Sequence, residues 1–289
     1  MKTKTIIIII AFLFAIGINA NAQKKIKILK ELKNFAFIPA GKVRVDTMKY
    51  DVQAFYISKF EVSNIQYREF LDSLFKDGEL VKRRIAGVDA TGWAKVNGNK
   101  FPDAMSDYYS THPAYNDYPV VNISYEGVLM YCQWLTKKYN ALNKNKSIEY
   151  NFTLPTKLQW IRAARGSSTF EYSWMKMGKN RDGIQGNFKF LNYENIHFNQ
   201  QTQKYEIINT FISKTREEDL TAPVKSYWPN MFGVYNMCGN AAEMILEKGI
   251  AIGGSYNDPG YDVRVESIQS YQGATPFIGF RPVMIVIKM

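Results

Sequence analysis

The chain has 289 residues, of which 46% are hydrophobic and 15% aromatic, so it can form a packed core and is not a disordered polymer. Its formal net charge is +11. Only two cysteines and two histidines occur, with no Cys-x-x-Cys pair or Cys/His cluster, so a structural zinc site is not expected.

The N-terminus has the pattern of a secretory signal peptide. Lys2 and Lys4 precede an uncharged apolar run at residues 6–18, and Ala-Asn-Ala at 20–22 fits a cleavage site. This run is shorter than the about 20 residues that a transmembrane helix needs. We therefore expect residues 1–22 to be removed on export. The mature chain is then expected in the periplasm or at the periplasmic face of the outer membrane.

Residues 23–34 form a basic lead-in that contains five lysines. Such a run can bind nucleic acid or anionic lipid. An exported protein rarely meets nucleic acid, so we expect a solvated segment and no nucleic-acid partner. No cysteine lies near the cleavage site to accept a lipid, so membrane association is expected to be only indirect. Without a repeat or a Pro/Ser-rich linker, residues 35–289 are predicted to form a single domain.

Hydrophobic patterning predicts strands within residues 35–60, followed by a helix that Ser63 caps with Gln66 as its capping-box partner. The face of this helix that is expected to be buried consists of Phe70, Leu71, Leu74 and Phe75. Residues 76–118 show no hydrophobic period and are predicted to form a long surface loop.

A short strand is predicted at residues 118–123, before a second helix that Ser124 caps. The inward face of this helix is expected to contain Val128, Cys132 and Leu135. A third helix is predicted from the capping box of Thr156 and Gln159 to Gly166. The weak alternation of residues 280–289 predicts a closing strand.

Seven short motifs occur in order between residues 35 and 283. They are EVSN (61–64), YPVVNISYE (118–126), YCQWL (131–135), LPTxxQWxxAARG (154–166), APV with PN, FGVYNM, GN and E (222–243), GGS (253–255) and GFR (279–281). Together they resemble the formylglycine-generating-enzyme-like, or sulfatase-modifying factor, domain. The resemblance implies an α+β fold, the irregular C-type-lectin-like fold of that enzyme type.

A narrower resemblance involves HPAYNDYPVV at residues 112–121. This stretch is similar to HPAYDDYPVV in gliding-motility and type IX secretion lipoproteins, which carry the same domain without its catalysis. The resemblance implies a non-catalytic component of the cell envelope whose partners are other envelope proteins. The chain departs from those lipoproteins because it has no lipid-accepting cysteine.

The family's oxidase binds copper through two closely spaced cysteines after its GGS motif, and soft thiolates suit that metal. Here Asp258 and Val263 fall near the two cysteine positions, and residues 255–263 contain no sulfur. Because this loop lacks the two cysteines that the resemblance leads us to expect, we predict no bound copper and no formylglycine generation by a cysteine pair. Candidate binding residues of this loop are Ser255, Tyr256 and Asp258. A nucleophilic Ser255 would need a positioned base, so a role in turn geometry is expected instead.

The resemblance also implies calcium, which oxygen ligands bind. The family's calcium loop falls here on Asn236, Gly239, Ala241 and Glu243. A second family site falls on Asn187 and Phe188, with Asp219 as its acidic partner. The alternative for the first loop is that Asn236 and Asn240 only make turn hydrogen bonds.

The sequence leaves two further questions open. Export permits a disulfide between Cys132 and Cys238, and two buried free thiols are equally compatible with the sequence. Three functions are compatible with the motifs, namely an envelope interaction protein, an enzyme of unknown class and a ligand-binding module. The first is favoured.

Overall fold

The computed structural model describes residues 30–95, 102–174, 186–189, 196–207 and 220–288. The expected signal peptide at 1–22 and most of the basic lead-in at 23–34 lie outside these residues. The chain divides into two compact units, residues 1–33 and 34–289. Of the first unit, only the start of the short 3-10 helix η1 (Lys30–Asn34) is described. No helix within the described ranges is long and apolar enough to cross a membrane.

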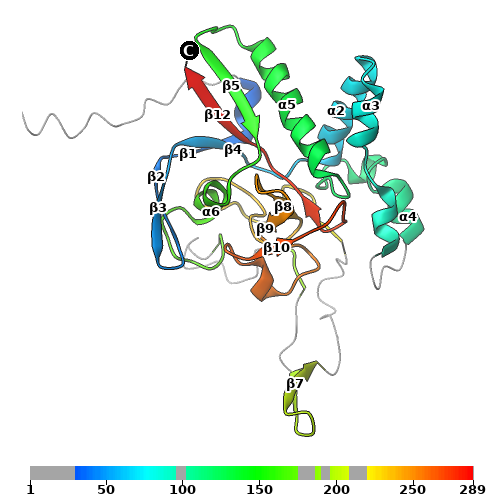
Figure 1. Cartoon of the computed structure of the whole chain (residues 1–289), viewed down its shortest axis with the longest axis vertical. Coiled ribbons are helices and arrows are strands. Elements are labelled where there is room, and N and C mark those ends of the chain that lie inside the picture. Colours follow the sequence, from blue (N-terminus) through cyan, green and yellow to red (C-terminus); the bar gives the residue numbers. More distant parts are fainter. Residues whose placement is uncertain (1–29, 96–101, 175–185, 190–195, 208–219, 289) are drawn as a thin grey trace, which may run out of the picture. The chain divides into compact units, whose positions relative to one another are not determined.

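Strands from both ends of the second unit meet in one four-stranded sheet (Figure 1). Its order is β1 (Phe35–Ile38), β4 (Phe55–Ser58), β12 (Val283–Lys288) and β5 (Ile148–Thr153). Neighbouring strands are antiparallel, and Ile57 faces Ala36 on one side and Val283 on the other. All three side chains are buried, so the closing strand completes the core sheet.

The remaining strands form a second four-stranded sheet and two hairpins. The second four-stranded sheet has the order β10 (Ile268–Ser270), β9 (Ile250–Ile252), β8 (Ala242–Met244) and β11 (Ile278–Gly279). Two hairpins are β2 (Gly41–Val45) with β3 (Met48–Val52), and β6 (Ile196–Asn199) with β7 (Lys204–Ile207). Together with the five α-helices of the described residues, these sheets confirm the expected α+β class.

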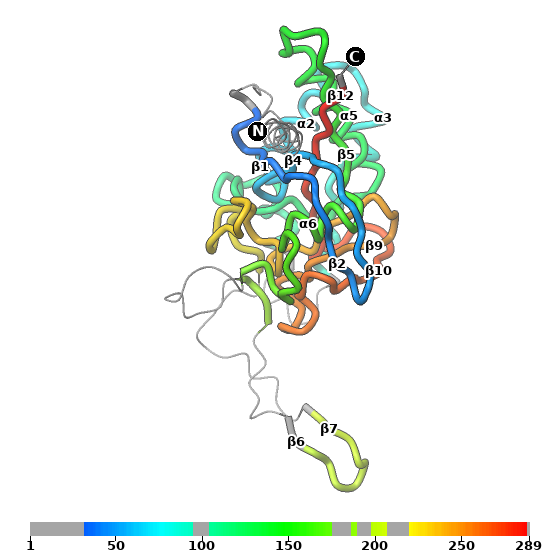
Figure 2. Tube along the Cα trace, turned by 90° about the vertical axis from the view of Figure 1, so that its left-hand side faces the viewer, coloured from blue at the N-terminus to red at the C-terminus, as the bar shows by residue number. Residues whose placement is uncertain are grey.

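The three predicted helices are present as α2 (Asn64–Lys76), α5 (Tyr125–Leu142) and α6 (Lys157–Arg165). The predicted caps form. Gly127 N–H donates to Ser124 Oγ at 3.0 Å, and Gln159 N–H donates to Thr156 Oγ1 at 3.2 Å. Figure 2 shows α6 beside the β2–β3 hairpin, with which it is in contact. The predicted inward residues of α5 are buried.

Two features of the first part of the domain differ from the sequence-based expectation. The buried residues of α2 are Asn64, Tyr67, Phe70 and Leu74. Phe75 is 61% exposed, because it lies about 100° around the helix from Leu74. The expected loop at 76–118 contains α3 (Leu80–Ile85), α4 (Pro102–Tyr108) and the 3-10 turns η2 (Ala90–Lys95) and η3 (Pro113–Tyr115). Since α3 buries none of its side chains, its sequence has no hydrophobic period from which the helix could be predicted.

The prediction of a strand at residues 118–123 is also wrong. Only Pro119 makes a bridge, to Ser63, although Val120, Val121 and Ile123 are buried. Apolar residues alone gave the strand signal, and here they fill the core from an irregular segment.

The two cysteines are free and buried, so the alternative of two separate thiols holds. Cys132 lies on α5, and Cys238 lies in the loop before β8. Burial raises the pKa of the Cys132 thiol to about 12 and that of the Cys238 thiol to about 11.

Candidate functional site

The loop that follows β9 corresponds to the family's cysteine-bearing segment, and Asp258 organises it. Both the backbone N–H and the Oγ of Ser255 donate to Asp258 Oδ2, each at 2.7 Å. Gln269 Nε2 donates to the same oxygen at 3.2 Å. The N–H of Asn257 in turn donates to Ser255 Oγ at 3.2 Å. The carboxylate therefore closes a turn around the serine.

This geometry disfavours a nucleophilic role for Ser255. Its side chain is fully buried, and its hydroxyl is directed at a carboxylate that already has other donors. A serine nucleophile needs a general base that accepts its proton and is itself oriented, usually a histidine. The imidazole Nδ1 of His112 instead accepts from Ala114 N–H at 3.2 Å. The expected turn role for Ser255 fits these contacts.

The two positions that resemble the family's cysteines have different surroundings. Asp258 is part of the turn, and Val263 is fully buried at the end of the 3-10 helix η5 (Gly260–Val263). A Cβ on Gly254 would lie 2.8 Å from Val263 Cα, so the loop folds back closely on itself. Within the described residues, no group of three or more His, Cys, Asp and Glu side chains is placed to hold a metal ion.

A buried polar network lies next to this loop. Its centre is Glu61, which lies two residues before the capping Ser63 of α2. Glu61 Oε2 accepts from Asn236 Nδ2 at 3.0 Å, and Oε1 accepts from Asn240 Nδ2 at 2.7 Å. Burial raises the pKa of Glu61 to about 7, against the opposing attraction of Arg281. The sequence motifs did not assign any role to Glu61.

A second carboxylate of the network, Glu243 on β8, is paired with Arg281. The arginine Nε donates to both carboxylate oxygens, at 2.8 and 2.7 Å, and Trp160 Nε1 donates to Oε2 at 2.6 Å. The guanidinium also donates to the backbone carbonyls of Ser58, Lys59 and Tyr235. Both partners are buried, and a buried ion pair is tolerated only when its remaining donors are satisfied in this way.

The network and the loop are joined through the backbone of residues 239–240. Tyr256 N–H donates to Asn240 O at 2.8 Å, and Gly239 N–H donates to Gly253 O at 2.8 Å. Asn240 has a φ of +70°, and its Oδ1 accepts from Ala222 N–H at 2.6 Å. The structure therefore brings the predicted loop residues and the predicted calcium loop together.

The structure describes two of the three residues of the second expected calcium site, Asn187 and Phe188. Asn187 O accepts from Asn240 N–H at 2.7 Å, and Asn187 Nδ2 donates to Leu220 O at 2.8 Å. A Cβ on Gly239 would lie 2.3 Å from Asn187 O, so only glycine fits there. Phe188 stacks on Trp174 with ring centroids 6.2 Å apart. Asp219 lies outside the described residues.

One atom supports a cation at the first expected site. Asn236 Oδ1 is buried and has no hydrogen-bond partner among the residues that the structure describes. An unpaired buried acceptor is costly, and a hard cation would satisfy it. Glu243 offers oxygen donors as well, although Arg281 and Trp160 already donate to both of them. The observation that fits a calcium ion is thus the unpaired side-chain oxygen of Asn236.

Trp160, Asn240 and Arg281 are the network members that the sequence did not mark as functional, in addition to Glu61. Each belongs to a recognisable motif, QW, GN or GFR, so a signal was present. Motif order alone does not show that these segments converge on one buried cluster.

Comparison with known proteins agrees with the motifs. The chain matches the family model described as "Sulfatase-modifying factor enzyme 1-like domain" over residues 22–285. The formylglycine-generating enzyme of Bos taurus is 28% identical over 234 residues, which cover 74% of this chain and 52% of the bovine protein. The enzyme of Mus musculus is 28% identical over 229 residues, covering 71% of this chain and 50% of its own length. The chain thus spans about half the length of these relatives.

Solved structures share the fold. The crystal structure of CarF has a TM-score of 0.57 and 19% identity, covering 86% of this chain and 97% of CarF. PvdO from Pseudomonas aeruginosa has a TM-score of 0.56 and 17% identity, covering 89% of this chain and 97% of PvdO. These neighbours confirm the expected α+β fold of the formylglycine-generating-enzyme type. The family match over residues 22–285 takes in both the closing loop and the whole buried network. The chain therefore belongs to the sulfatase-modifying-factor family of formylglycine-generating-enzyme-like domains.

Proposed function

We propose that this chain is a non-catalytic, exported member of the family that works in the cell envelope as a structural or interaction component of secretion or gliding machinery. The closing loop carries the proposal. At the two positions that resemble the oxidase's cysteines, Asp258 accepts hydrogen bonds within a turn and Val263 is buried. Thiolates bind copper(I) and oxygens do not replace them, so this loop does not support that oxidation.

The chain's own thiols do not offer a substitute. Cys132 lies on α5, Cys238 lies between Asn236 and Asn240 of the buried network, and both thiols are buried. Their raised pKa values keep the sulfur protonated at neutral pH, whereas the thiolate is the metal ligand and nucleophile. The mammalian relatives are named as formylglycine-generating enzymes. This chain would need a thiol pair of another origin to share that activity.

The envelope assignment is supported by the HPAYNDYPVV stretch at 112–121. Its first part is on the surface, where His112 caps η3 and Pro113 and Ala114 are exposed. Its second part enters the core, where Val120 and Val121 are buried. The stretch thus has exposed residues that a partner protein can contact and buried residues that hold them in place.

The proposal also includes calcium as a structural ion. Asn236 Oδ1, the backbone carbonyls of Gly239 and Ala241, and the carboxylate of Glu243 would hold it. Calcium would supply positive charge to a buried oxygen cluster and fix the loop between Asn236 and β8. The unpaired Asn236 Oδ1 supports this assignment.

Co-purification tests the envelope role. The tagged full chain is expressed in its own host, envelope extracts are crosslinked, and bound proteins are identified by mass spectrometry. An unrelated exported domain with the same tag serves as the control bait. Secretion or gliding components enriched over that control are expected. Enrichment of none of them would contradict the proposal.

A further inference from the structure

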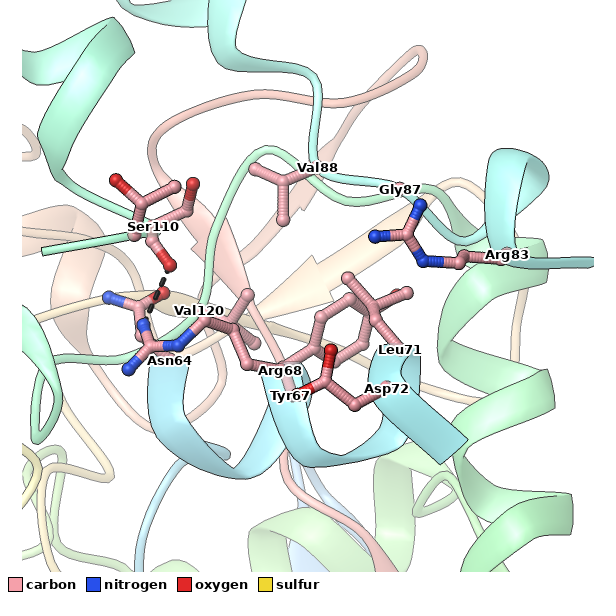
Figure 3. Close-up of a pocket in the computed structure, with 11 residues that line it drawn as sticks. Asn64, Tyr67, Arg68, Leu71, Asp72, Arg83, Gly87, Val88, Ser110 and Val120 are labelled. Atoms are coloured by element: carbon pink, nitrogen blue, oxygen red, sulfur yellow. Dashed lines mark hydrogen bonds between the residues drawn. The ribbon is translucent and has the colours of Figure 1, made fainter. Parts of the chain in front are cut away.

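A cavity of about 310 Å³ lies between α2, α3 and the segment at residues 110–111 (Figure 3). None of the residues that line it belongs to the closing loop or to the buried network. Its volume is at the lower end of the range of small-ligand pockets, which is about 300–1,000 Å³. It therefore has room for one residue of a bound chain and not for a large cofactor.

Two side chains of opposite charge line this cavity without pairing. Within the described residues, the Arg83 guanidinium makes no hydrogen bond or ion pair, and its recorded contact is the Phe75 ring at 5.5 Å. Among the residues that the structure describes, the Asp72 carboxylate also has no hydrogen-bond or ion-pair partner, Arg83 included. Figure 3 shows the two side chains entering from different helices, Asp72 from α2 and Arg83 from α3.

Arg68 adds a second, fixed positive charge. Its Nη1 donates to Ser110 O at 2.7 Å, and its Nη2 donates to Asn116 Oδ1. These bonds hold the guanidinium at the cavity wall and leave its charge unneutralised. Two arginines against one aspartate give the lining an excess of positive charge, so an anionic group is favoured there.

Apolar side chains form another part of the wall, beside the polar residues Asn64, Ser110 and Thr111. Leu71, Val88 and Val120 line the cavity, and Val120 is itself buried in the core. An inorganic anion such as phosphate could pair with the arginines but would leave Asp72 and these apolar side chains without a partner. A ligand that carries a carboxylate, an N–H donor and a small apolar group satisfies all three kinds of lining together.

We propose that this cavity binds the carboxyl-terminal residue of a peptide that ends in a small apolar amino acid. The terminal carboxylate pairs with Arg83, and Arg68 strengthens the local positive field. The last amide N–H donates to Asp72, and the apolar side chain contacts Leu71, Val88 and Val120. This site is separate from the closing loop, so it stands whether or not the protein is catalytic.

The test uses the dipeptide N-acetyl-Ala-Val with a free carboxylate, and the same dipeptide with a C-terminal amide. Binding to the mature chain is measured by NMR titration or calorimetry. The free acid is expected to bind saturably, and the amide about tenfold or more weaker, since a hydrogen bond to a charged group contributes about 1.5–3 kcal/mol.

Arg83→Gln is compared with Arg84→Gln, a matched control on the neighbouring exposed residue, which does not line the cavity. Arg83→Gln is expected to weaken binding of the acid about tenfold, and Arg84→Gln by less than about twofold. Because both arginines are exposed, both variants should fold, which thermal unfolding verifies. Equal binding of acid and amide, equal effects of the two substitutions, or no saturable binding would each overturn the proposal.

Discussion

The side-chain amide of Asn240 donates to Glu61 Oε1 at 2.7 Å, although 179 residues separate the two in the sequence. The same asparagine donates to Ala222 O and accepts from Ala222 N–H, so it ties three distant segments together. Its backbone carbonyl also accepts from Tyr256 N–H in the closing loop. Asn240 thus connects the closing loop to the buried network.

Replacement of Asn240 by alanine is expected to lower the free energy of unfolding by about 2–4 kcal/mol. The substitution leaves a buried Glu61 oxygen and the Ala222 N–H without their partner, and alanine is strained at a φ of +70°. Urea denaturation of the metal-free protein measures the loss. Asn257→Ala, in the half-buried part of the closing loop, is the control and should change stability by less than about 0.5 kcal/mol. Similar losses of unfolding free energy in the two variants would show that the hydrogen bonds of the Asn240 side chain do not contribute specially to stability.

The Glu243–Arg281 pair predicts a non-additive result. Arg281→Met leaves a fully buried carboxylate with only Trp160 as a partner, which should cost about 3–5 kcal/mol. Adding Glu243→Gln removes that charge, so the double variant should be more stable than Arg281→Met alone. Denaturant titrations of the two variants decide this. A double variant that is less stable than the single one would argue against an unpaired charge as the cause.

Calcium is expected to stabilise the protein through Asn236. At a calcium concentration about 100 times its dissociation constant, the gain would be about 2.7 kcal/mol, seen as a higher Tm than in a chelator. Asn236→Ala removes the unpaired buried oxygen and should abolish the difference between the calcium and chelator samples. Asn257→Ala should retain it. Identical melting of the unaltered protein in both buffers would contradict the assignment.

The buried thiols should be inert in the folded protein. Burial raises the pKa of Cys132 to about 12, so the sulfur stays protonated through the mildly alkaline range where an exposed cysteine, with a pKa of about 8.5, becomes reactive. Alkylation by iodoacetamide at roughly pH 8 is expected only after unfolding in guanidinium. Rapid labelling of the native chain, or a mass that shows a disulfide, would be contrary to this expectation.

Export predicts a defined N-terminus. If residues 1–22 are a signal peptide, the protein recovered from the periplasmic fraction begins at Gln23, which intact-mass measurement detects. Replacement of Ala22 by a bulky residue such as tryptophan should block cleavage and leave the uncut precursor. A full-length chain in the cytoplasm of cells that express the unaltered protein would refute the export hypothesis.

Local signals in the sequence predicted the helices and the strands at the two ends of the domain. Ser124 and Thr156 are caps whose partners lie three residues away, so short-range chemistry defines where α5 and α6 begin. The closing strand β12 was also detectable from its alternation. The short helix α3 was not, because a six-residue helix with no buried side chain has no hydrophobic period.

The candidate site was predictable only in part, and for a related reason. Motif resemblance singled out Asn236, Glu243 and Ser255, and the structure places them on neighbouring segments. Glu61 and Arg281 acquire their roles from long-range packing, which places a carboxylate from before α2 and a guanidinium from before β12 around one loop. No spacing in the sequence encodes that convergence.

The central claim is that this family member has kept the scaffold without the thiol chemistry of the oxidase. The most direct test incubates the purified mature chain with copper(I) and a cysteine-containing peptide, and detects aldehyde by hydrazone labelling and mass spectrometry. A catalytically active family member serves as the positive control. We predict no aldehyde and no tight copper(I) uptake by this chain. Tight copper(I) binding together with conversion of the peptide thiol to an aldehyde would contradict the account.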